Sequence, residues 1–203
     1  MIGIIDYGLG NIRAFANVYK NLNLPIKIIK TKEELRRVNK IILPGVGDFD
    51  HAMTLMNNSG MLETLNEMVL VDKVPVLGIC VGMQMLAKSS EEGELSGLGW
   101  IDAEVKKFNA GELLNMPIPH MGWNDVHPIT NNKLLDGLEN NAKFYFLHSY
   151  YFECKNKQEA IAHTEYGRKF DSVVNSDNIY GVQCHPEKSH QYGILLLRNF
   201  ANL

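Results

Sequence analysis

Hydrophobic residues in the first half of this chain form two alternating patterns. Short runs rich in isoleucine, leucine and valine predict strands, and they alternate with stretches whose apolar residues recur at helical spacing. Apolar strands separated by helices are typical of a parallel sheet covered on both faces. The predicted strands are residues 2–6, 26–29, 41–43 and 74–79, and the predicted helices are residues 11–21, 61–71 and a short one at the Thr31 and Glu34 capping box.

The second half has a different pattern, with short β-rich runs separated by turn residues. These runs predict strands over residues 99–106, 144–152, 159–164, 170–175 and 179–183, followed by a closing helix over residues 189–203. The sequence contains no repeat or linker, so we predict one α/β domain over residues 1–203. We expect a mostly parallel central sheet with flanking helices and an antiparallel β extension.

The composition limits the classes of function. Hydrophobic residues make up 45% of the chain and charged residues 21%, with a net charge of −3, so neither disorder nor nucleic-acid binding is indicated. No apolar stretch approaches the roughly 20 residues of a membrane span, and the first residues are strand-like rather than a signal peptide. The three cysteines lack metal-ligand spacing and a paired framework. We therefore expect a cytoplasmic protein without a metal.

A cysteine between two glycines is the first candidate for catalysis. The sequence Gly78-Ile79-Cys80-Val81-Gly82 follows an apolar run, where a sharp strand-to-helix turn would expose the thiol. Glycines permit the strained backbone of such a turn, and the start of a helix favours the thiolate. Buried free cysteines are common in protein cores, so the pentapeptide alone leaves a structural role open.

A histidine and a glutamate near the C-terminus supply the groups that a nucleophilic cysteine needs. His185 and Glu187 are two residues apart at the end of an apolar run, so they can lie in line, with Glu187 orienting the imidazole toward a thiol. Alone, a His-Pro-Glu sequence is often an ordinary surface turn. Together with the glycine-flanked Cys80, it predicts a catalytic triad.

Attack on a carbonyl also requires hydrogen-bond donors for the oxyanion. The backbone N–H of Val81, directly after the nucleophile, is the first expected donor. The second is expected from residues 44–47 (PGVG), where Gly47 and the glycine before Val46 allow the backbone to turn an N–H into the site. A Pro-Gly-x-Gly segment after a strand is also a common turn, so both interpretations stay open.

Longer stretches resemble a known family. Residues 78–84 (GICVGMQ) and residues 185–187 (HPE) resemble the class I, triad-type glutamine amidotransferases, which hydrolyse the side-chain amide of glutamine at a Cys-His-Glu site. Within this class, the chain is similar from end to end to the glutaminase subunits of imidazole glycerol phosphate synthase. The stretches that carry this similarity are residues 6–11 (DYGLGN), 44–49 (PGVGDF), 119–124 (PHMGWN), 144–150 (FYFLHSY) and 186–189 (PEKS).

The resemblance implies a flavodoxin-like sheet and a role for each matching residue. Cys80 is the expected nucleophile, His185 the base and Glu187 its orienting acid. Glu92 is expected to bind the α-amino group of glutamine, with a solvated acidic loop as the alternative interpretation. The complete set of expected glutamine-binding residues is Gln84, Glu92, Ser149 and Tyr150.

The resemblance also implies a heterodimer in which ammonia passes to a (β/α)₈-barrel cyclase subunit. The residues expected at its docking surface are Asn11, Trp123, Tyr145 and Lys188, although a lone Trp or Tyr is more often a core residue. We assign His120 and His148 to structure. Cys184 stands where the family usually has an aromatic residue, and we expect it to be a buried core residue and not a second nucleophile. No cofactor and no nucleic-acid or membrane partner is implied.

Three alternatives remain open from the sequence. One is a paralogous glutaminase subunit that supplies ammonia to a sugar amidotransferase in surface-polysaccharide synthesis. Another is the glutaminase of pyridoxal-phosphate synthase, disfavoured because residues 44–47 stand where that enzyme has a Gly-Gly-Glu-Ser loop. The third is a non-catalytic regulatory binding module, which the intact Cys80, His185 and Glu187 disfavour.

Overall fold

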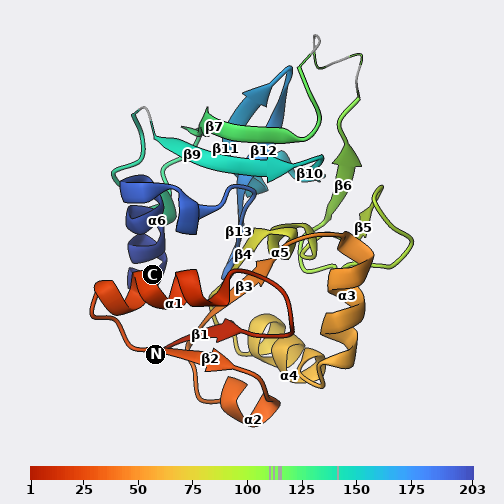
Figure 1. Ribbon diagram of the computed structural model, residues 1–203. Coiled ribbons are helices and arrows are strands. Elements are labelled where there is room, and N and C mark those ends of the chain that lie inside the picture. The colour runs from red at the N-terminus through yellow and green to blue at the C-terminus, as the bar shows by residue number, and fades with distance from the viewer. Residues whose placement is uncertain (110, 112, 114–115, 141) are drawn as a thin grey trace.

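The computed structural model describes residues 1–109, 111, 113, 116–140 and 142–203. Within them, the central element is an eight-stranded sheet of order β2-β1-β3-β4-β13-β12-β11-β8 (Figure 1). The first five strands in this order are parallel: β2 (Ile26–Ile29), β1 (Ile2–Ile5), β3 (Lys40–Gly45), β4 (Val76–Cys80) and β13 (Ile179–Val182). The others are antiparallel: β12 (Arg168–Ser176), β11 (Ala160–Tyr166) and β8 (His127–Pro128). The predicted mostly parallel sheet with an antiparallel extension is confirmed.

Helices cover both faces of the parallel part. α1 (Ile12–Asn21) and α6 (His190–Asn202) pack together on one face, where the Tyr19 hydroxyl donates a 3.1 Å hydrogen bond to the Leu197 carbonyl (Figure 1). α3 and α4 lie on the other face. The remaining helical elements are α2 (Lys32–Leu35), α3 (Phe49–Asn58), α4 (Leu62–Asn66), η1 (Glu67–Val71), α5 (Val81–Gln84), η2 (Lys133–Leu135), η3 (Lys157–Glu159) and η4 (Pro186–Lys188).

Two helical regions differ from the sequence-based expectation. The helix predicted over residues 61–71 ends early, and a π-helical turn, η1, completes it. The Asn178 side chain explains this widening, because its Nδ2 donates to the carbonyls of Val69 and Val74 at 2.9 Å each. α3 was not predicted from the sequence, although Asp48 caps it by accepting from His51 N–H. Its buried residues have helical spacing: Phe49, Ala52, Met53 and Met56.

The strand predicted over residues 144–152 is wrong as one element. It consists of β9 (Lys143–His148), which pairs with β7 (His120–Asp125), and β10 (Tyr150–Cys154), which belongs to a separate three-stranded sheet. The break at Ser149 has a local cause, since His148 Nδ1 lies 2.7 Å from the Tyr150 carbonyl oxygen. That contact turns the chain out of line. The other strands of the three-stranded sheet are β6 (Ala103–Lys107) and β5 (Ser89–Ser90).

The parallel strands determine where the candidate residues meet. Gly45 at the end of β3 is in register with Cys80 at the end of β4, and Val182 at the end of β13 is in register with Ile79. His185 follows β13 by three residues, so base and nucleophile leave the sheet at the same edge. Ligands of open α/β sheets bind outside this carboxyl edge.

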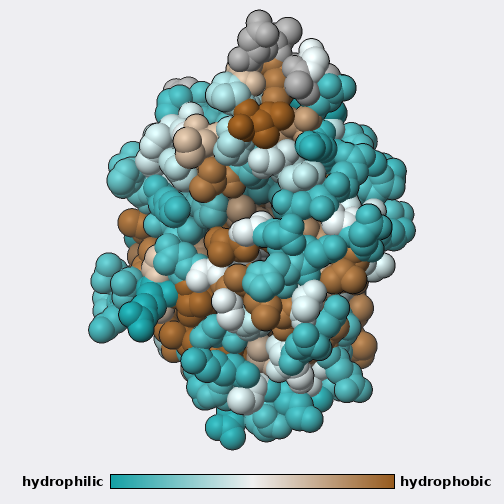
Figure 2. All heavy atoms as spheres, turned by 45° about the vertical axis from the view of Figure 1, so that its right-hand side comes forward, coloured by the Kyte–Doolittle hydropathy of each residue, from teal (hydrophilic) through white to brown (hydrophobic). Residues whose placement is uncertain are grey.

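One face of the molecule carries mostly polar side chains. Figure 2 shows a face covered largely by hydrophilic residues, with hydrophobic residues in scattered groups. Large exposed hydrophobic side chains include Met121, which is 64% exposed, and Trp123, which is 47% exposed, both on β7. No helix in the described part of the chain is long and apolar enough to cross a membrane.

Candidate active site

Cys80 lies at a strained turn between β4 and α5. Its backbone has φ 56° and ψ −115°, outside the usual helical and extended regions. A Cβ atom on Gly78 would lie 2.6 Å from the Gly82 carbonyl oxygen, and a Cβ atom on Gly82 would collide with the Leu43 carbonyl. The glycines therefore allow β3, β4 and α5 to approach closely enough to hold this turn.

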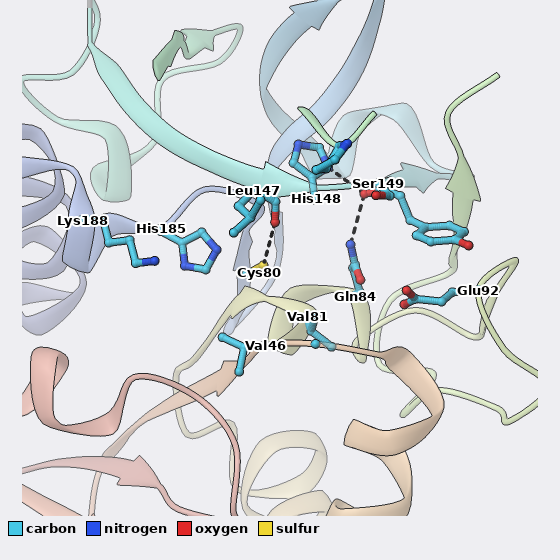
Figure 3. A pocket seen from close by; sticks show the side chains of 13 residues that line it. Val46, Cys80, Val81, Gln84, Glu92, Leu147, His148, Ser149, His185 and Lys188 are labelled. Carbon is cyan, nitrogen blue, oxygen red and sulfur yellow. Dashed lines mark hydrogen bonds between the residues drawn. The ribbon is translucent and has the colours of Figure 1, made fainter. Parts of the chain in front are cut away.

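His185 reaches the thiol from the segment that follows β13. Its Nδ1 lies 3.0 Å from Glu187 Oε1, and its ring lies beside Cys80 in the cavity that both residues line (Figure 3). The segment is held in place because His185 N–H donates to the Tyr145 carbonyl at 2.8 Å, and Ser189 Oγ donates to the His185 carbonyl at 2.6 Å. The structure thus places Cys80, His185 and Glu187 next to one another.

The surroundings of His185 favour its protonated form. Burial alone would lower its pKa, but the hydrogen bonds and negative charges of Cys80 and Glu187 outweigh burial, and the pKa of His185 is raised above its ordinary value. A thiolate paired with an imidazolium is the reactive state of a nucleophilic cysteine. The arrangement can therefore perform covalent catalysis on a carbonyl.

Cys80 opens into a cavity of about 480 Å³, within the range of small-molecule sites. Figure 3 shows His185 and Lys188 on one side of Cys80, and Gln84 and Glu92 on the other. The cavity brings together the expected nucleophile, base, oxyanion donors and glutamine-binding residues. Its lining is Val46, Gly47, Cys80, Val81, Gln84, Glu92, Pro119, Leu147, His148, Ser149, Tyr150, His185 and Lys188.

Gln183 is a residue of the site that the sequence analysis missed. It is fully buried; its Nε2 lies 3.9 Å from Cys80 Sγ, and its Oε1 accepts a 3.1 Å hydrogen bond from Gln84 Nε2. Gln84 Nε2 also donates to the Tyr150 carbonyl at 3.1 Å. With both amide hydrogens used, Gln84 has its Oε1 left to accept an N–H group of a ligand. A polar residue in an apolar strand, two positions before His185, was the available signal.

Glu92 lies in the cavity rather than on a solvated loop. Its Oε2 accepts a 3.0 Å hydrogen bond from Phe49 N–H at the start of α3. Burial raises the pKa of Glu92, the charges of Asp48 and Asp50 act in the same direction, and the bond from Phe49 opposes them. This group of carboxylates makes one end of the cavity favourable for an ammonium group.

The turn expected to supply an oxyanion donor is anchored at one end. The Tyr7 hydroxyl donates a 2.8 Å hydrogen bond to the Pro44 carbonyl, a contact that the sequence analysis did not foresee. Gly47 has φ 84°, and within the described chain nothing lies within 4 Å of a Cβ atom built on it. Val81 is the first residue of α5, where N–H groups have no intrahelical acceptor. The turn therefore has space to rotate at Gly47.

Three residues expected at the docking surface gather around His185. The Tyr145 ring lies 6.5 Å from the His185 ring, the Trp123 ring lies 6.1 Å from Tyr145, and Lys188 Nζ lies 5.5 Å from the centre of the Tyr145 ring. Trp123 is 47% exposed and is not a core residue. Asn11 is exposed and directly precedes α1. Among described residues, no group of three His, Cys, Asp or Glu side chains could hold a metal ion.

Comparisons with known proteins agree with this geometry. Residues 3–202 match the family described as glutamine amidotransferase class-I. Imidazole glycerol phosphate synthase subunit HisH of Bdellovibrio bacteriovorus is 56% identical, and HisH of Leptospira interrogans is 55% identical; both alignments cover 100% of both chains. The chain belongs to the HisH family of class-I glutamine amidotransferases. The expected enzyme class, a glutamine amidotransferase, is confirmed.

Solved structures agree on the fold. A structure described as a glutamine amidotransferase superimposes with a TM-score of 0.77 at 21% identity, covering 99% of this chain and 97% of that chain. The structure of PurLQS from Thermotoga maritima gives a TM-score of 0.74 at 15% identity, with the same coverage of 99% and 97%. At such low identity these likenesses show the fold alone, and they confirm the expected fold class.

We expect Gly82→Ala to destabilise the fold more than Gly60→Ala. A Cβ atom at residue 82 collides with the Leu43 carbonyl, so β3 or α5 must shift, at about 2 kcal/mol or more. Gly60 has φ 71° and, among described atoms, none within 4 Å of an added Cβ, so its variant carries backbone strain alone, about 1 kcal/mol. Thermal unfolding measures both variants, and equal losses would contradict the steric explanation.

We expect Glu187→Gln to lower the pKa of His185 toward its ordinary 6.5, because one of the two groups that stabilise the imidazolium loses its charge. A raised pKa contributes stability that is present below pH 6.5 and lost as pH rises through the native pKa, so this loss should be smaller and complete at a lower pH in the variant. Ring-nitrogen NMR of His185 measures the titration, with His163 as internal control. The same His185 titration in both proteins would refute the role of Glu187.

Proposed function

We propose that this chain is the glutaminase subunit of imidazole glycerol phosphate synthase and supplies ammonia for histidine biosynthesis. The observation that carries the proposal is that His185, held by Glu187 at 3.0 Å, lies beside Cys80 in a cavity of small-molecule size. HisH relatives between 42% and 56% identical over the whole chain support the pathway. The proposal treats residues 1–203 as one glutamine amidotransferase domain.

The first half-reaction forms a thioester. Cys80 Sγ attacks the Cδ carbonyl of glutamine, forming an S–C bond while the C=O electron pair moves to oxygen. The N–H groups of Val81 and of the turn at Gly47 stabilise this oxyanion. The imidazolium of His185 then donates its proton to the amide nitrogen, the C–N bond breaks, and ammonia leaves.

The second half-reaction releases glutamate. Neutral His185 takes a proton from water as the water oxygen attacks the thioester carbonyl. Collapse of the second oxyanion breaks the S–C bond and restores the thiolate beside an imidazolium. Glu187 holds the His185 ring by the Nδ1 contact of 3.0 Å, so one imidazole orientation serves both steps.

The cavity gives glutamine one orientation. Glu92 binds the α-ammonium group at the end that is lined by carboxylates, and Gln84 Oε1 accepts an N–H group of the substrate. The backbone of Ser149 and Tyr150 completes the pocket wall. The side-chain amide of glutamine then faces Cys80. Figure 3 shows that Glu92 and His185 lie on opposite sides of the thiol, which leaves room for this orientation.

The subunit name of the relatives supports a partner, and we propose that it is a (β/α)₈-barrel cyclase that receives ammonia directly. Ammonia released into water would be protonated and diluted. The docking surface is assigned to Asn11, Trp123, Tyr145 and Lys188, of which all but Tyr145 are exposed. We place the complex in the cytoplasm, where a reducing environment keeps the Cys80 thiol free.

Two measurements test the proposal. Purified cyclase-like proteins from the same organism are added singly, and we expect one of them to raise the rate of glutamate release. Expression of the chain in a histidine auxotroph that lacks its glutaminase subunit should then restore growth without histidine. Stimulation without rescue of growth would instead favour the sugar-modifying paralogue, and no stimulation by any of them would reject the partner assignment.

We expect Cys80→Ala to abolish glutaminase activity, whereas Cys154→Ala and Cys184→Ala retain most of it. Loss of a nucleophile removes several orders of magnitude in kcat. Burial raises the pKa of Cys154 and of Cys184, so neither thiol is poised to react. Mass spectrometry after labelling with a glutamine-mimicking electrophile locates the adduct. An adduct chiefly on Cys184 would overturn the assignment.

We expect the chain alone to hydrolyse glutamine slowly, and partner plus synthase substrate to raise kcat by about 10² to 10³, the contribution of one oxyanion donor. The gain should appear in kcat rather than KM, because the donor acts on charge formed in the transition state. Gly47→Val should impair stimulation, since its φ of 84° is unfavourable for valine, while complex formation persists.

Gly60→Val is the matched control for Gly47→Val, because it places the same residue at another positive φ, 71°. It should leave stimulation intact. Full activity of the isolated chain, or stimulation confined to KM, would count against the oxyanion gate.

A further inference from the structure

A chain of hydrogen bonds runs from β7 into the cavity. Asn124 Nδ2 lies 3.2 Å from His120 Nε2, and His120 Nδ1 lies 2.9 Å from His148 Nε2. His148 Nδ1 in turn lies 2.7 Å from the Tyr150 carbonyl oxygen. Both imidazoles are buried, so no solvent exchange replaces these contacts.

Because both imidazoles are neutral, this series of hydrogen bonds has a single order of donors and acceptors. Burial lowers the pKa of His120 to about 4, and burial followed by the charge of His120 lowers that of His148 to about 3, so both rings are neutral near pH 7. The Tyr150 carbonyl only accepts, so His148 Nδ1 carries the proton and its Nε2 accepts from His120 Nδ1–H. His120 Nε2 then accepts from the Asn124 amide. Every donor has an acceptor in this order alone.

The inner end of the chain continues to the nucleophile. The Tyr150 carbonyl that His148 fixes also accepts from Gln84 Nε2 at 3.1 Å. Gln84 continues through Gln183 to Cys80 Sγ. The position of one backbone carbonyl therefore sets the orientation of the amide that faces glutamine.

The outer end of the chain lies behind an exposed apolar face. Successive residues of a strand point to opposite faces, and on β7 Met121 and Trp123 are exposed, at 64% and 47%, whereas His120 is buried. His120 stacks on Phe146, at 4.8 Å between ring centres, and on Tyr166, at 4.0 Å. The His120 ring is therefore packed against β9 and β11, and its 2.9 Å contact links β7 to His148.

We propose that His120 and His148 are positioning residues that couple docking of the partner on the Met121 and Trp123 face of β7 to the glutamine pocket. The coupling rests on the proposed function, because its outer end needs the cyclase subunit. The inner end acts in the isolated chain, where His148 fixes the carbonyl that orients Gln84.

The inner end is tested without a partner. Inactivation of Cys80 by a glutamine-analogue chloroketone gives a saturation constant, KI, and iodoacetamide reports the intrinsic reactivity of the thiol. His148→Leu should raise KI about tenfold, the effect of one hydrogen bond, with the iodoacetamide rate within about twofold. His148→Asn keeps a donor near the Nδ1 position and should restore KI to within about threefold. A His148→Leu variant with wild-type KI, or failure of Asn to rescue, overturns the inference.

The outer end is tested with the cyclase subunit. His120→Leu and Asn124→Leu should each lower partner-stimulated kcat about fivefold or more, with partner affinity and KI changed less than about threefold. Asn124→Leu leaves both buried rings in place, so this variant tests the coupling if His120→Leu does not fold. His163→Leu is the matched control, because His163 contacts Asp171 at 3.1 Å and takes no part in the hydrogen bonds between Asn124 and Tyr150. Stimulation of His120→Leu and Asn124→Leu like wild type overturns the coupling, whereas absence of stimulation in wild type rejects the proposed function instead.

Discussion

The contact between three backbone segments beside Cys80 is the constraint on which the site depends. A Cβ atom on Gly45 would collide with Gly82 N–H, and one on Gly82 would collide with the Leu43 carbonyl. Because these backbones touch, the turn after β4 cannot relax, and Cys80 keeps a positive φ that costs on the order of 1–3 kcal/mol. The almost fully buried strands β3 and β4 offset that cost by hydrophobic packing. The Cys80 thiol is thus held where the strands are tightly packed.

β9 is the second element that the site requires, because its residues contact His185, Cys80 and Tyr150 of the pocket wall. The Tyr145 carbonyl accepts from His185 N–H, the Leu147 carbonyl lies 3.9 Å from Cys80 Sγ, and His148 fixes the Tyr150 carbonyl. A single strand therefore aligns both sides of the cavity with the edge of the central sheet. Within the described chain, β9 pairs with β7 alone and forms no ladder with a strand of the central sheet.

The chemistry could be predicted from the sequence because its signals are local. Glycines around Cys80 and the spacing of His185 and Glu187 each lie within one short segment, and parallel strands deliver such segments to one edge. The hydrogen bonds of Gln183 and the pairing of β7 with β9 could not be predicted in this way. They depend on contacts between distant segments, such as Gln84 with Gln183 and His120 with His148. The Ser149 break depends on one histidine-to-carbonyl contact, which an apolar run does not reveal.

The charges around the cavity support the proposed orientation of glutamine. Cys80 and Glu187 raise the pKa of His185 despite burial, whereas burial and the neighbouring His120 and His185 lower the pKa of His148. Neutral His148 adds no charge beside Cys80 and His185, while the Glu92 carboxyl group lies at the other end of the cavity. An ammonium group placed beside neutral His148 would lose hydration without gaining a counter-charge. In the proposed complex, the ammonium end of glutamine therefore lies at Glu92, and the uncharged amide reaches Cys80.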